Sequence, residues 1–133
     1  MPDWSIKIVP SRRRGGPAAF VPDLKGAKPG QALVAQVDDL VTWNNTTNDA
    51  HWPWPADVSY AKLPDDKVSQ QAGNYLSNQI QPGLSSRPSY DVVMPAAGTT
   101  IYYCCKLHPE EHGMITVTAI PPPLPTTPSD TGS

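Results

Sequence analysis

Proline and glycine interrupt this chain along its whole length. Its 133 residues include 17 prolines and 9 glycines, about one residue in five, against ~12% in average proteins. Because proline ends helices and glycine weakens them, this composition argues against long helices. One compact domain with a two-layer core is the expectation for a chain of this length.

Charge and hydrophobicity exclude two broad classes of protein. Ten basic residues against twelve acidic ones give a net charge of −2, which is too balanced for the basic surface of a nucleic-acid-binding protein. Apolar runs extend for only a few residues, far short of the ~20 that cross a bilayer, so we expect no transmembrane segment. Residues 1–4 lack the positive region and apolar stretch of a signal peptide, which leaves either an intracellular chain or the mature form of an exported one.

Runs of β-branched and aromatic residues predict a series of short strands. They occupy residues 5–9, 32–37, 40–44, 89–93, 99–105 and 114–119. Asp38 and Asp39 separate the second run from the third and predict a tight hairpin between them. Residues 56–88 mix polar residues with glycine and proline, and allow one short helical turn or strand between Tyr75 and Ile80.

About seven to eight short strands with little helix signal predict the fold class, an all-β, Greek-key β-sandwich. Residues 12–17, 26–30 and 95–98 are predicted loops or turns, because glycine, proline or clustered arginine dominates them. The domain is predicted to span residues 1–120. Residues 121–133 are rich in proline, serine and threonine and are predicted to form a disordered tail.

The only two cysteines, Cys104 and Cys105, are neighbours in the sequence. They therefore cannot join distant parts of the chain, and a disulfide between adjacent residues would be strained. A free thiolate is a soft metal ligand, so metal chemistry is one expected use of these residues. Strand alternation points the two side chains to opposite faces, with Tyr103 on the same side as Cys105. Cys104 is most simply a small buried residue.

Candidate metal ligands gather just after these cysteines. A strand that ends at Cys105 and turns through the next two residues brings its thiolate close to the imidazole of His108. A histidine from a distant loop, His51, is the candidate for a third ligand. One thiolate and two imidazoles suit copper or zinc, and a trigonal His₂Cys set with a weak axial ligand is the blue-copper arrangement that moves one electron. Structural zinc sites usually take four ligands from paired Cys and His motifs, and the sequence has no second such pair, which favours copper.

This ligand segment resembles that of the cupredoxin family, the small blue-copper electron carriers such as plastocyanin, azurin and amicyanin. Cys105 and His108 match the family's C-x-x-H motif, and residues 113–117, GMITV, are similar to its final strand, G-x-[IV]-x-V. Upstream, residues 41–45, VTWNN, resemble V-x-W-x-N, which precedes the first histidine ligand and here leads to His51.

The resemblance covers most of residues 30–120 and implies a function. It implies one copper ion (Cu⁺/Cu²⁺) per chain, bound by His51, Cys105 and His108, in a mononuclear electron-transfer protein with no catalytic residues. The Cys105 thiolate would conduct the electron, and the edge of His108 would be its exit. The partners implied are redox proteins that dock near His108. No nucleic-acid partner is implied, and we expect a monomer in the periplasm or another exported compartment.

The family's axial methionine position falls on Glu111 in this sequence, whether it is counted from Gly113 or from His108. An axial carboxylate would stabilise Cu(II) over Cu(I) and lower the reduction potential. Met114 is not expected to substitute, because it lies on the strand face opposite the apolar core residues. His112 is the alternative ligand, which would give a set similar to that of red-copper nitrosocyanin. A three-ligand site without a strong axial donor is a further alternative.

Trp52 departs from the family pattern. Cupredoxins commonly place an asparagine after the first histidine, and this asparagine hydrogen-bonds the cysteine loop. That tie is expected to be missing here, with Asn44 or Asn45 as the candidate replacement. Trp52 and Trp54 could shield the site from water, form an apolar docking patch near His108, or pack as core residues.

Three other classes of function remain open. A copper site with carboxylate or additional histidine ligation could act in catalysis or sensing, since a metal with an open position can bind a substrate. Copper storage or delivery is a second class, and a metal-free interaction domain is a third. The resemblance favours an electron carrier over an enzyme.

Overall fold

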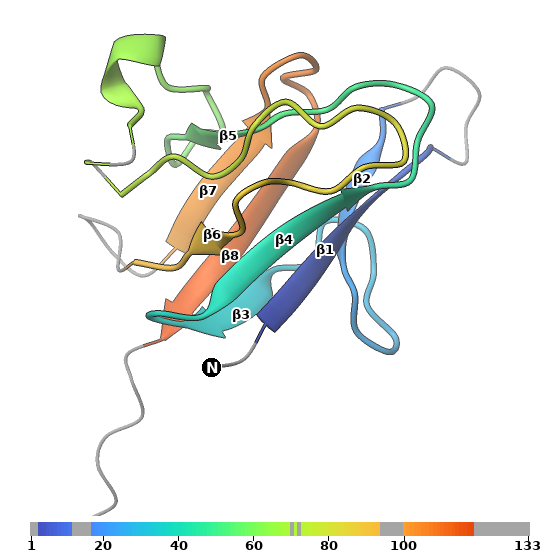
Figure 1. The fold of residues 1–133 in the computed structure, drawn as a ribbon, viewed down its shortest axis with the longest axis horizontal. Helices are drawn as coiled ribbons and strands as arrows, with labels where there is room; N and C mark the ends of the chain where they lie inside the picture. The colour runs from blue at the N-terminus through green and yellow to red at the C-terminus, as the bar shows by residue number, and fades with distance from the viewer. Residues whose placement is uncertain (1–2, 12–16, 70, 72, 94–99, 119–133) are drawn as a thin grey trace, which may run out of the picture.

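The computed structural model describes residues 3–11, 17–69, 71, 73–93 and 100–118. These ranges contain eight strands and one short 3₁₀ turn (Figure 1). The strands are β1 (Asp3–Val9), β2 (Ala19–Pro22), β3 (Leu33–Gln36), β4 (Leu40–Asn45), β5 (Pro53–Ala56), β6 (Tyr90–Asp91), β7 (Thr100–Cys105) and β8 (His112–Thr118). The 3₁₀ turn, η1, spans Asp65–Lys67. The prediction of an all-β protein with seven to eight strands is confirmed.

The strands form two four-stranded sheets that pack face to face (Figure 1). The first sheet has the order β2-β1-β4-β6 and the second has the order β3-β8-β7-β5. One pair in each sheet is parallel, β1 with β4 and β3 with β8, and the other pairs are antiparallel. Because parallel neighbours cannot be joined by a hairpin, the chain crosses between the layers. This arrangement is the predicted Greek-key β-sandwich.

The core lies between the two sheets and follows the alternation of the strands. Along β4, half-buried and buried residues alternate, and Val41 and Trp43 are fully buried. Tyr103 and Cys105, which were predicted to share one face of β7, both point into the core. The Tyr103 ring lies edge-on to Phe20 and Trp43, with centroid distances of 4.9 and 5.4 Å. Burial of each such large side chain contributes about 2 kcal/mol, so these rings hold the two sheets together.

The predicted hairpin between residues 32–37 and 40–44 is wrong. β3 and β4 belong to different sheets, and the turn between them carries the chain from one layer to the other. Asp39 stabilises this crossing. Its buried carboxylate accepts hydrogen bonds from the indole N–H of Trp4 at 2.7 Å and from the main-chain N–H of Gln36 at 2.8 Å. A buried carboxylate needs such donors, and here one comes from β1 and the other from the end of β3.

Two strands lie where the sequence predicts none. β5 contains two prolines and occupies an edge of the second sheet, where a missing N–H is tolerated. β2 ends in a proline and occupies an edge of the first sheet. The sequence allowed one short helical turn or strand between Tyr75 and Ile80, but the helical turn among the described residues lies at Asp65–Lys67. Ile80 instead forms an isolated β-bridge with His51.

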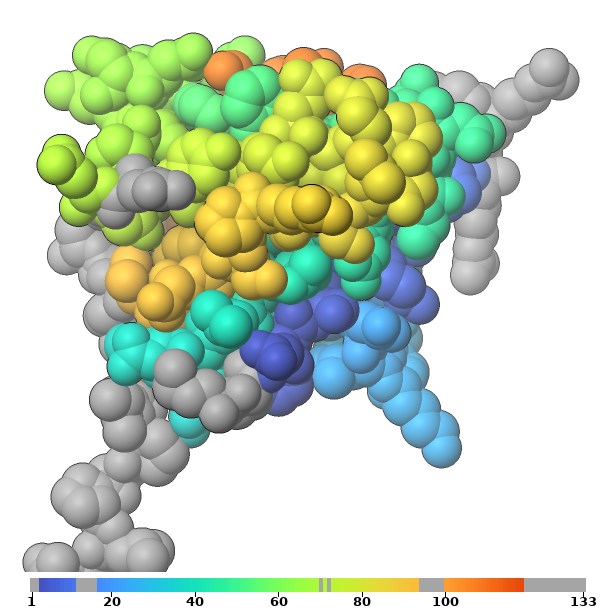
Figure 2. All heavy atoms as spheres, viewed as in Figure 1, coloured from blue at the N-terminus to red at the C-terminus, as the bar shows by residue number. Residues whose placement is uncertain are grey.

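The long connection between β5 and β6 occupies much of the face seen in Figure 2, and residues 73–89 run beside β4 (Figure 1). Main-chain hydrogen bonds tie this connection to the neighbouring strand. The N–H of Asn45 donates to the carbonyl of Leu84 at 2.9 Å, and the N–H of Ser86 donates to the carbonyl of Trp43 at 2.8 Å. The connection therefore continues the first sheet beyond β4.

Some predictions concern residues outside the described ranges. The arginine-rich loop at 12–16, the turn at 95–98 and the tail at 121–133 belong to this group. Within the described part of the chain, no helix has the length and apolar character needed to cross a membrane.

Gly113 in β8 allows the Tyr103 side chain to pack closely against the main chain. A β-carbon at this position would lie 2.3–2.6 Å from three atoms of the Tyr103 side chain. Because Tyr103 is packed between Phe20 and Trp43, it cannot move aside freely. We expect Gly113→Ala to lower the free energy of unfolding by about 2 kcal/mol, as overpacking does, in urea denaturation of the metal-free protein. Thr116→Ala on the opposite face of β8 is the control, and an equal loss in both variants would contradict this account.

Candidate metal centre

His51 is placed by a loop that the end of β4 organises. The buried side chain of Asn45 donates to the carbonyl oxygens of Asp49 and Ile80 at 2.7 and 3.1 Å. Its amide oxygen accepts the N–H and the hydroxyl of Thr47 at 2.9 and 2.7 Å. His51 and Ile80 then exchange main-chain hydrogen bonds at 3.0 and 2.7 Å. The loop is therefore fixed on both sides of His51.

Cys105, His108 and Glu111 are brought together by the turn from β7 into β8. The carbonyl of Cys105 accepts the N–H of His108 at 3.2 Å, and the carbonyl of His108 accepts the N–H of Glu111 at 2.9 Å. The N–H of Cys105 donates to the carbonyl of Glu111 at 3.0 Å and closes the loop. Hydrogen bonds at three-residue steps are those of successive tight turns, so the three side chains face a common centre.

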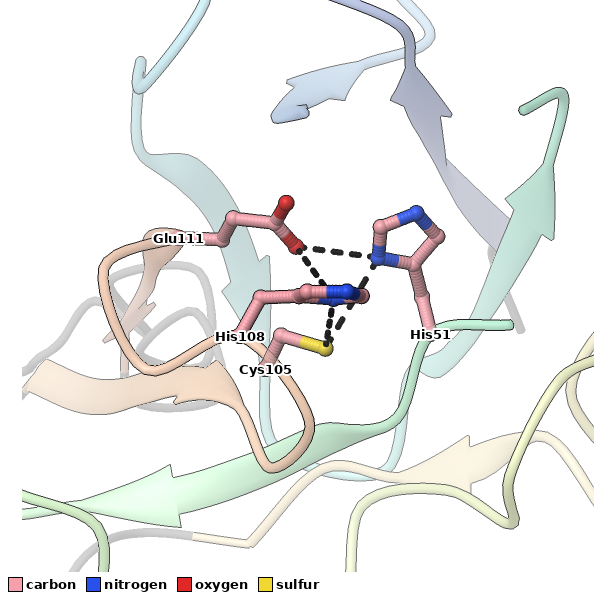
Figure 3. A group of neighbouring side chains, drawn as sticks. All are labelled: His51, Cys105, His108 and Glu111. Carbon is pink, nitrogen blue, oxygen red and sulfur yellow. Dashed lines mark hydrogen bonds and ion pairs between the residues drawn. The ribbon is translucent and has the colours of Figure 1, made fainter. Parts of the chain in front are cut away.

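Four donor atoms meet at this centre (Figure 3). Nδ1 of His51 lies 3.7 Å from Sγ of Cys105 and 2.9 Å from Oε1 of Glu111. Nδ1 of His108 lies 3.4 Å from the sulfur and 3.5 Å from the same carboxylate oxygen. All four donor atoms are within 4.8 Å of one another. Ligands held about 2.0–2.3 Å from one ion lie roughly 3–4.5 Å apart, so the cluster has nearly the dimensions of a mononuclear site.

Burial separates one of the four side chains from the rest. His51, Cys105 and Glu111 are 2%, 0% and 4% exposed. The side chain of His108 is 33% exposed. His108 is therefore the residue that connects the buried cluster to the surface.

The second carboxylate oxygen of Glu111 faces away from the cluster (Figure 3). Oε2 accepts the main-chain N–H of Ala18, which precedes β2, at 2.8 Å. The two residues are 93 positions apart. The sequence carries no signal for this contact, because every residue except proline has a main-chain N–H.

Negative groups set the electrostatics of the metal-free cluster. Burial by itself lowers the pKa of His51, but hydrogen bonds to Cys105 and Glu111 and the charge of these residues outweigh burial and raise the pKa to about 9. A metal ion must therefore displace a proton from His51 at neutral pH. Burial raises the pKa of Cys104 to about 11, so this thiol stays protonated and is a poor ligand.

Main-chain groups of Trp52 tie the two ligand loops together. Its N–H donates to Sγ of Cys105 at 3.3 Å, and its carbonyl accepts the N–H of Lys106 at 2.8 Å. The side-chain hydrogen bond to the cysteine loop is missing, as predicted, because the indole N–H of Trp52 donates to the carbonyl of Ser77, and the main chain joins the loops in its place. Asn44 and Asn45 do not replace it, since their side chains make hydrogen bonds elsewhere.

Trp52 and Trp54 pack against each other beside the ligand turn. Their rings are perpendicular, with centroids 5.5 Å apart, and both indole N–H groups donate to main-chain carbonyls. The Nζ atom of Lys106 lies 4.5 and 4.1 Å from the two ring centroids and pairs with Asp65 at 3.1 Å. The residue that follows Cys105 is thus held against two aromatic faces, which favours the packing role for these tryptophans.

Four other residues near the ligand turn lie outside the cluster. His112 is exposed and stacks on Tyr60, with ring centroids 4.3 Å apart and planes 7° apart. Met114 is half-buried and lies two residues farther along β8, on the same face as His112. Glu110 is exposed in the loop. Cys104 is fully buried, but it lies outside the core cluster that contains its neighbour in β7. Of the two candidate fourth ligands, Glu111 lies in the cluster, whereas His112 lies outside it against Tyr60.

The donor chemistry fits copper. Thiolate and imidazole are ligands that copper accepts in both oxidation states, and the carboxylate adds one harder donor. Zinc accepts the same three kinds of ligand, but only copper adds a one-electron couple. A buried site with these donors therefore suits a redox metal as well as a structural one.

The fold is that of the cupredoxins, and the His/Cys/His/Glu cluster fits a single copper site of the cupredoxin kind. A purple cupredoxin from Nitrosopumilus maritimus aligns over 86% of this chain and 98% of its own, with a TM-score of 0.55 and 20% identity. A multicopper oxidase aligns over 88% of this chain and 42% of its own, with a TM-score of 0.51 and 18% identity. A reduced amicyanin mutant aligns over 65% of this chain and 69% of its own, with a TM-score of 0.44 and 22% identity. No family model and no curated protein matches the sequence.

Proposed function

We propose that this protein binds one copper ion through His51, Cys105, His108 and Glu111 and carries single electrons between redox partner proteins. The observation that carries the proposal is the convergence of one thiolate, two imidazole nitrogens and one carboxylate oxygen on one point. Bound copper would supply a one-electron Cu(I)/Cu(II) couple at that point.

The hydrogen bonds that hold the ligand residues in place support a role as an electron carrier. The N–H of Trp52 donates to Sγ of Cys105, the side chain of Asn45 fixes the loop that ends in His51, and the turn after β7 is closed by its own hydrogen bonds. A site supported in this way keeps its geometry when the charge at its centre changes. Little rearrangement is what fast electron transfer requires.

The exposed part of His108 supports an exit for the electron. Its side chain is one third exposed, whereas the other three donors are buried. Redox partners would therefore approach closest to the cluster at His108. The proposal includes a monomeric chain without enzyme activity, in the exported compartments in which the cupredoxins generally work.

Titration of the purified, reduced protein with Cu(II) tests the proposal. An intense thiolate-to-copper absorption band should grow to saturation at one equivalent, with the electron paramagnetic resonance signal of a single Cu(II) site. Cys105→Ser should abolish the band, because it removes the sulfur ligand. Cys104→Ser is the matched control and should retain it, because this neighbouring thiol is fully buried and stays protonated.

Two outcomes would contradict the proposal in different ways. Absence of the band in the wild-type protein at one equivalent would exclude the copper–thiolate site. A band that survives Cys105→Ser, or is lost in Cys104→Ser, would show that Cys104 supplies the sulfur ligand.

An open copper site in an enzyme is the competing function. Oε1 of Glu111 stands against it, since this oxygen lies beside both histidine nitrogens and fills the fourth position. With four protein ligands, azide or nitrite should leave the Cu(II) spectrum unchanged. A spectrum that titrates with either anion would favour the enzyme.

A further inference from the structure

The two carboxylate oxygens of Glu111 have different surroundings. Oε1 lies 2.9 Å from Nδ1 of His51 and 3.5 Å from Nδ1 of His108. Oε2 accepts the N–H of Ala18 at 2.8 Å. Glu111 is 4% exposed, so water does not compete freely for either oxygen. One oxygen is offered to the centre and the other is held by the main chain.

We infer that the main-chain N–H of Ala18 is a positioning group that makes Glu111 a ligand through one oxygen only. This inference rests on the proposed copper site. A carboxylate can bind a metal through one oxygen or through both, and the choice depends on what else holds each oxygen. A hydrogen bond from an N–H to a carboxylate is charge-assisted and strong, so Oε2 stays with Ala18 while Oε1 faces the ion.

The position of Ala18 is fixed by the first sheet. Ala18 leads directly into β2, whose residues pair in register with β1, Ala19 with Val9 and Phe20 with Ile8. Phe20 is buried against the Tyr103 ring of the second sheet, at a centroid distance of 4.9 Å. The donor N–H is therefore part of a packed element.

Glu111 comes from the other sheet, in the turn between β7 and β8. Its hydrogen bond to Ala18 joins the two layers beside the centre. The direction of the carboxylate is consequently set by the packing of the sandwich and not by the ligand turn alone. This arrangement keeps the fourth ligand in place without a further side chain.

Removal of the N–H should release Oε2. Ala18→Pro lacks the donor, whereas Ala18→Gly keeps it and is the matched control. In the released state both oxygens of Glu111 can reach Cu(II), and they carry more negative charge because no donor polarises them. We expect Ala18→Pro to favour Cu(II) over Cu(I) at least threefold, a fall in reduction potential of about 30 mV or more, with a changed electron paramagnetic resonance spectrum.

The Glu111→Leu background separates this effect from simple distortion of the fold. There the carboxylate is absent, so Ala18→Pro should leave the potential and the spectrum unchanged. A potential that rises or stays constant in Ala18→Pro, or a shift of equal size in both backgrounds, would overturn the inference. Ala18→Gly should match the wild-type protein in both measurements.

Amide hydrogen exchange of the metal-free protein, followed by NMR, tests the contact without copper and without a change at Ala18. Glu111→Leu should speed exchange of the Ala18 amide at least tenfold. The amide of Gly30, which donates to the carbonyl of Phe20 at 3.0 Å, should not change. Equal Ala18 exchange in wild type and Glu111→Leu would overturn the inference even where the copper band is present. Failure of copper binding alone would instead overturn the proposed function.

Discussion

Glu111→Met is expected to raise the reduction potential of the copper-loaded protein by on the order of 100 mV, which is roughly a fiftyfold change in the relative affinity for Cu(I) and Cu(II). The substitution replaces a charged oxygen donor by a neutral thioether. In the structure that oxygen lies 2.9 and 3.5 Å from the two histidine nitrogens, close enough to be a full ligand. Cu(I) prefers soft sulfur, so it gains stability while Cu(II) loses it. A redox titration followed at the thiolate band measures the change.

Glu110→Met is the matched control for this prediction. It removes the same charge from the neighbouring position, where the side chain is exposed and water and salt screen it. The potential should then change by less than about 20 mV, because a screened charge interacts weakly with the centre. Equal shifts in both variants would show a long-range charge effect. An unchanged potential in Glu111→Met would remove Glu111 from the coordination sphere and leave a three-ligand site.

The ligand turn is the part of the site that the sequence could predict. Cys105, His108 and Glu111 are separated by steps of three residues, so local turns bring them together whatever the rest of the fold does. His51 lies 54 residues before Cys105, and no local rule joins them. Its place in the cluster could be predicted only from the resemblance of residues 41–45 to a family motif.

The strands show a similar division. β4 and β8 bury one face against the core, and their alternating residues made them predictable. β7 does not alternate in burial, but its β-branched and aromatic residues predicted a strand. β2 and β5 are edge strands that contain proline, so neither alternation nor strand propensity indicates them. The position of the turn at Asp38 and Asp39 could be predicted from the sequence. The sheet that each flanking strand joins depends on distant partners, and the sequence near the turn does not specify it.

Two supports of the centre come from the main chain. The N–H of Trp52 donates to the cysteine sulfur, and the N–H of Ala18 donates to the Glu111 carboxylate. Residue type does not encode such groups, because any residue except proline can provide them. The fold has to be known before they can be found, even where the ligands themselves are evident.

The centre is consequently built across both sheets. His51 follows β4 of the first sheet, whereas the turn from β7 to β8 belongs to the second sheet. Asn45, at the end of β4, is a buried residue through which the first sheet holds the loop of His51. A substitution at Asn45 should therefore lower both the stability of the fold and the affinity for the metal.

Asn45→Ala is expected to lower the free energy of unfolding of the metal-free protein by about 3 kcal/mol and to weaken copper binding at least about tenfold. The side chain is 2% exposed and makes four hydrogen bonds, to Asp49, to Ile80 and two with Thr47. Truncation removes a hydrogen-bond partner from buried groups of Thr47 and Ile80 and frees the loop that carries His51. Urea denaturation measures the first effect, and competition with a copper chelator measures the second.

Asn44→Ala separates this effect from a general weakening of β4. The neighbouring side chain is half-buried and accepts one hydrogen bond, from the hydroxyl of Ser85 at 2.5 Å. Its loss should cost about 1 kcal/mol or less and leave the copper affinity unchanged. Equal losses in the two variants would show that Asn45 has no special role. A destabilised Asn45→Ala protein with normal copper affinity would show that other contacts, such as the main-chain pair of His51 with Ile80, suffice to hold the ligand.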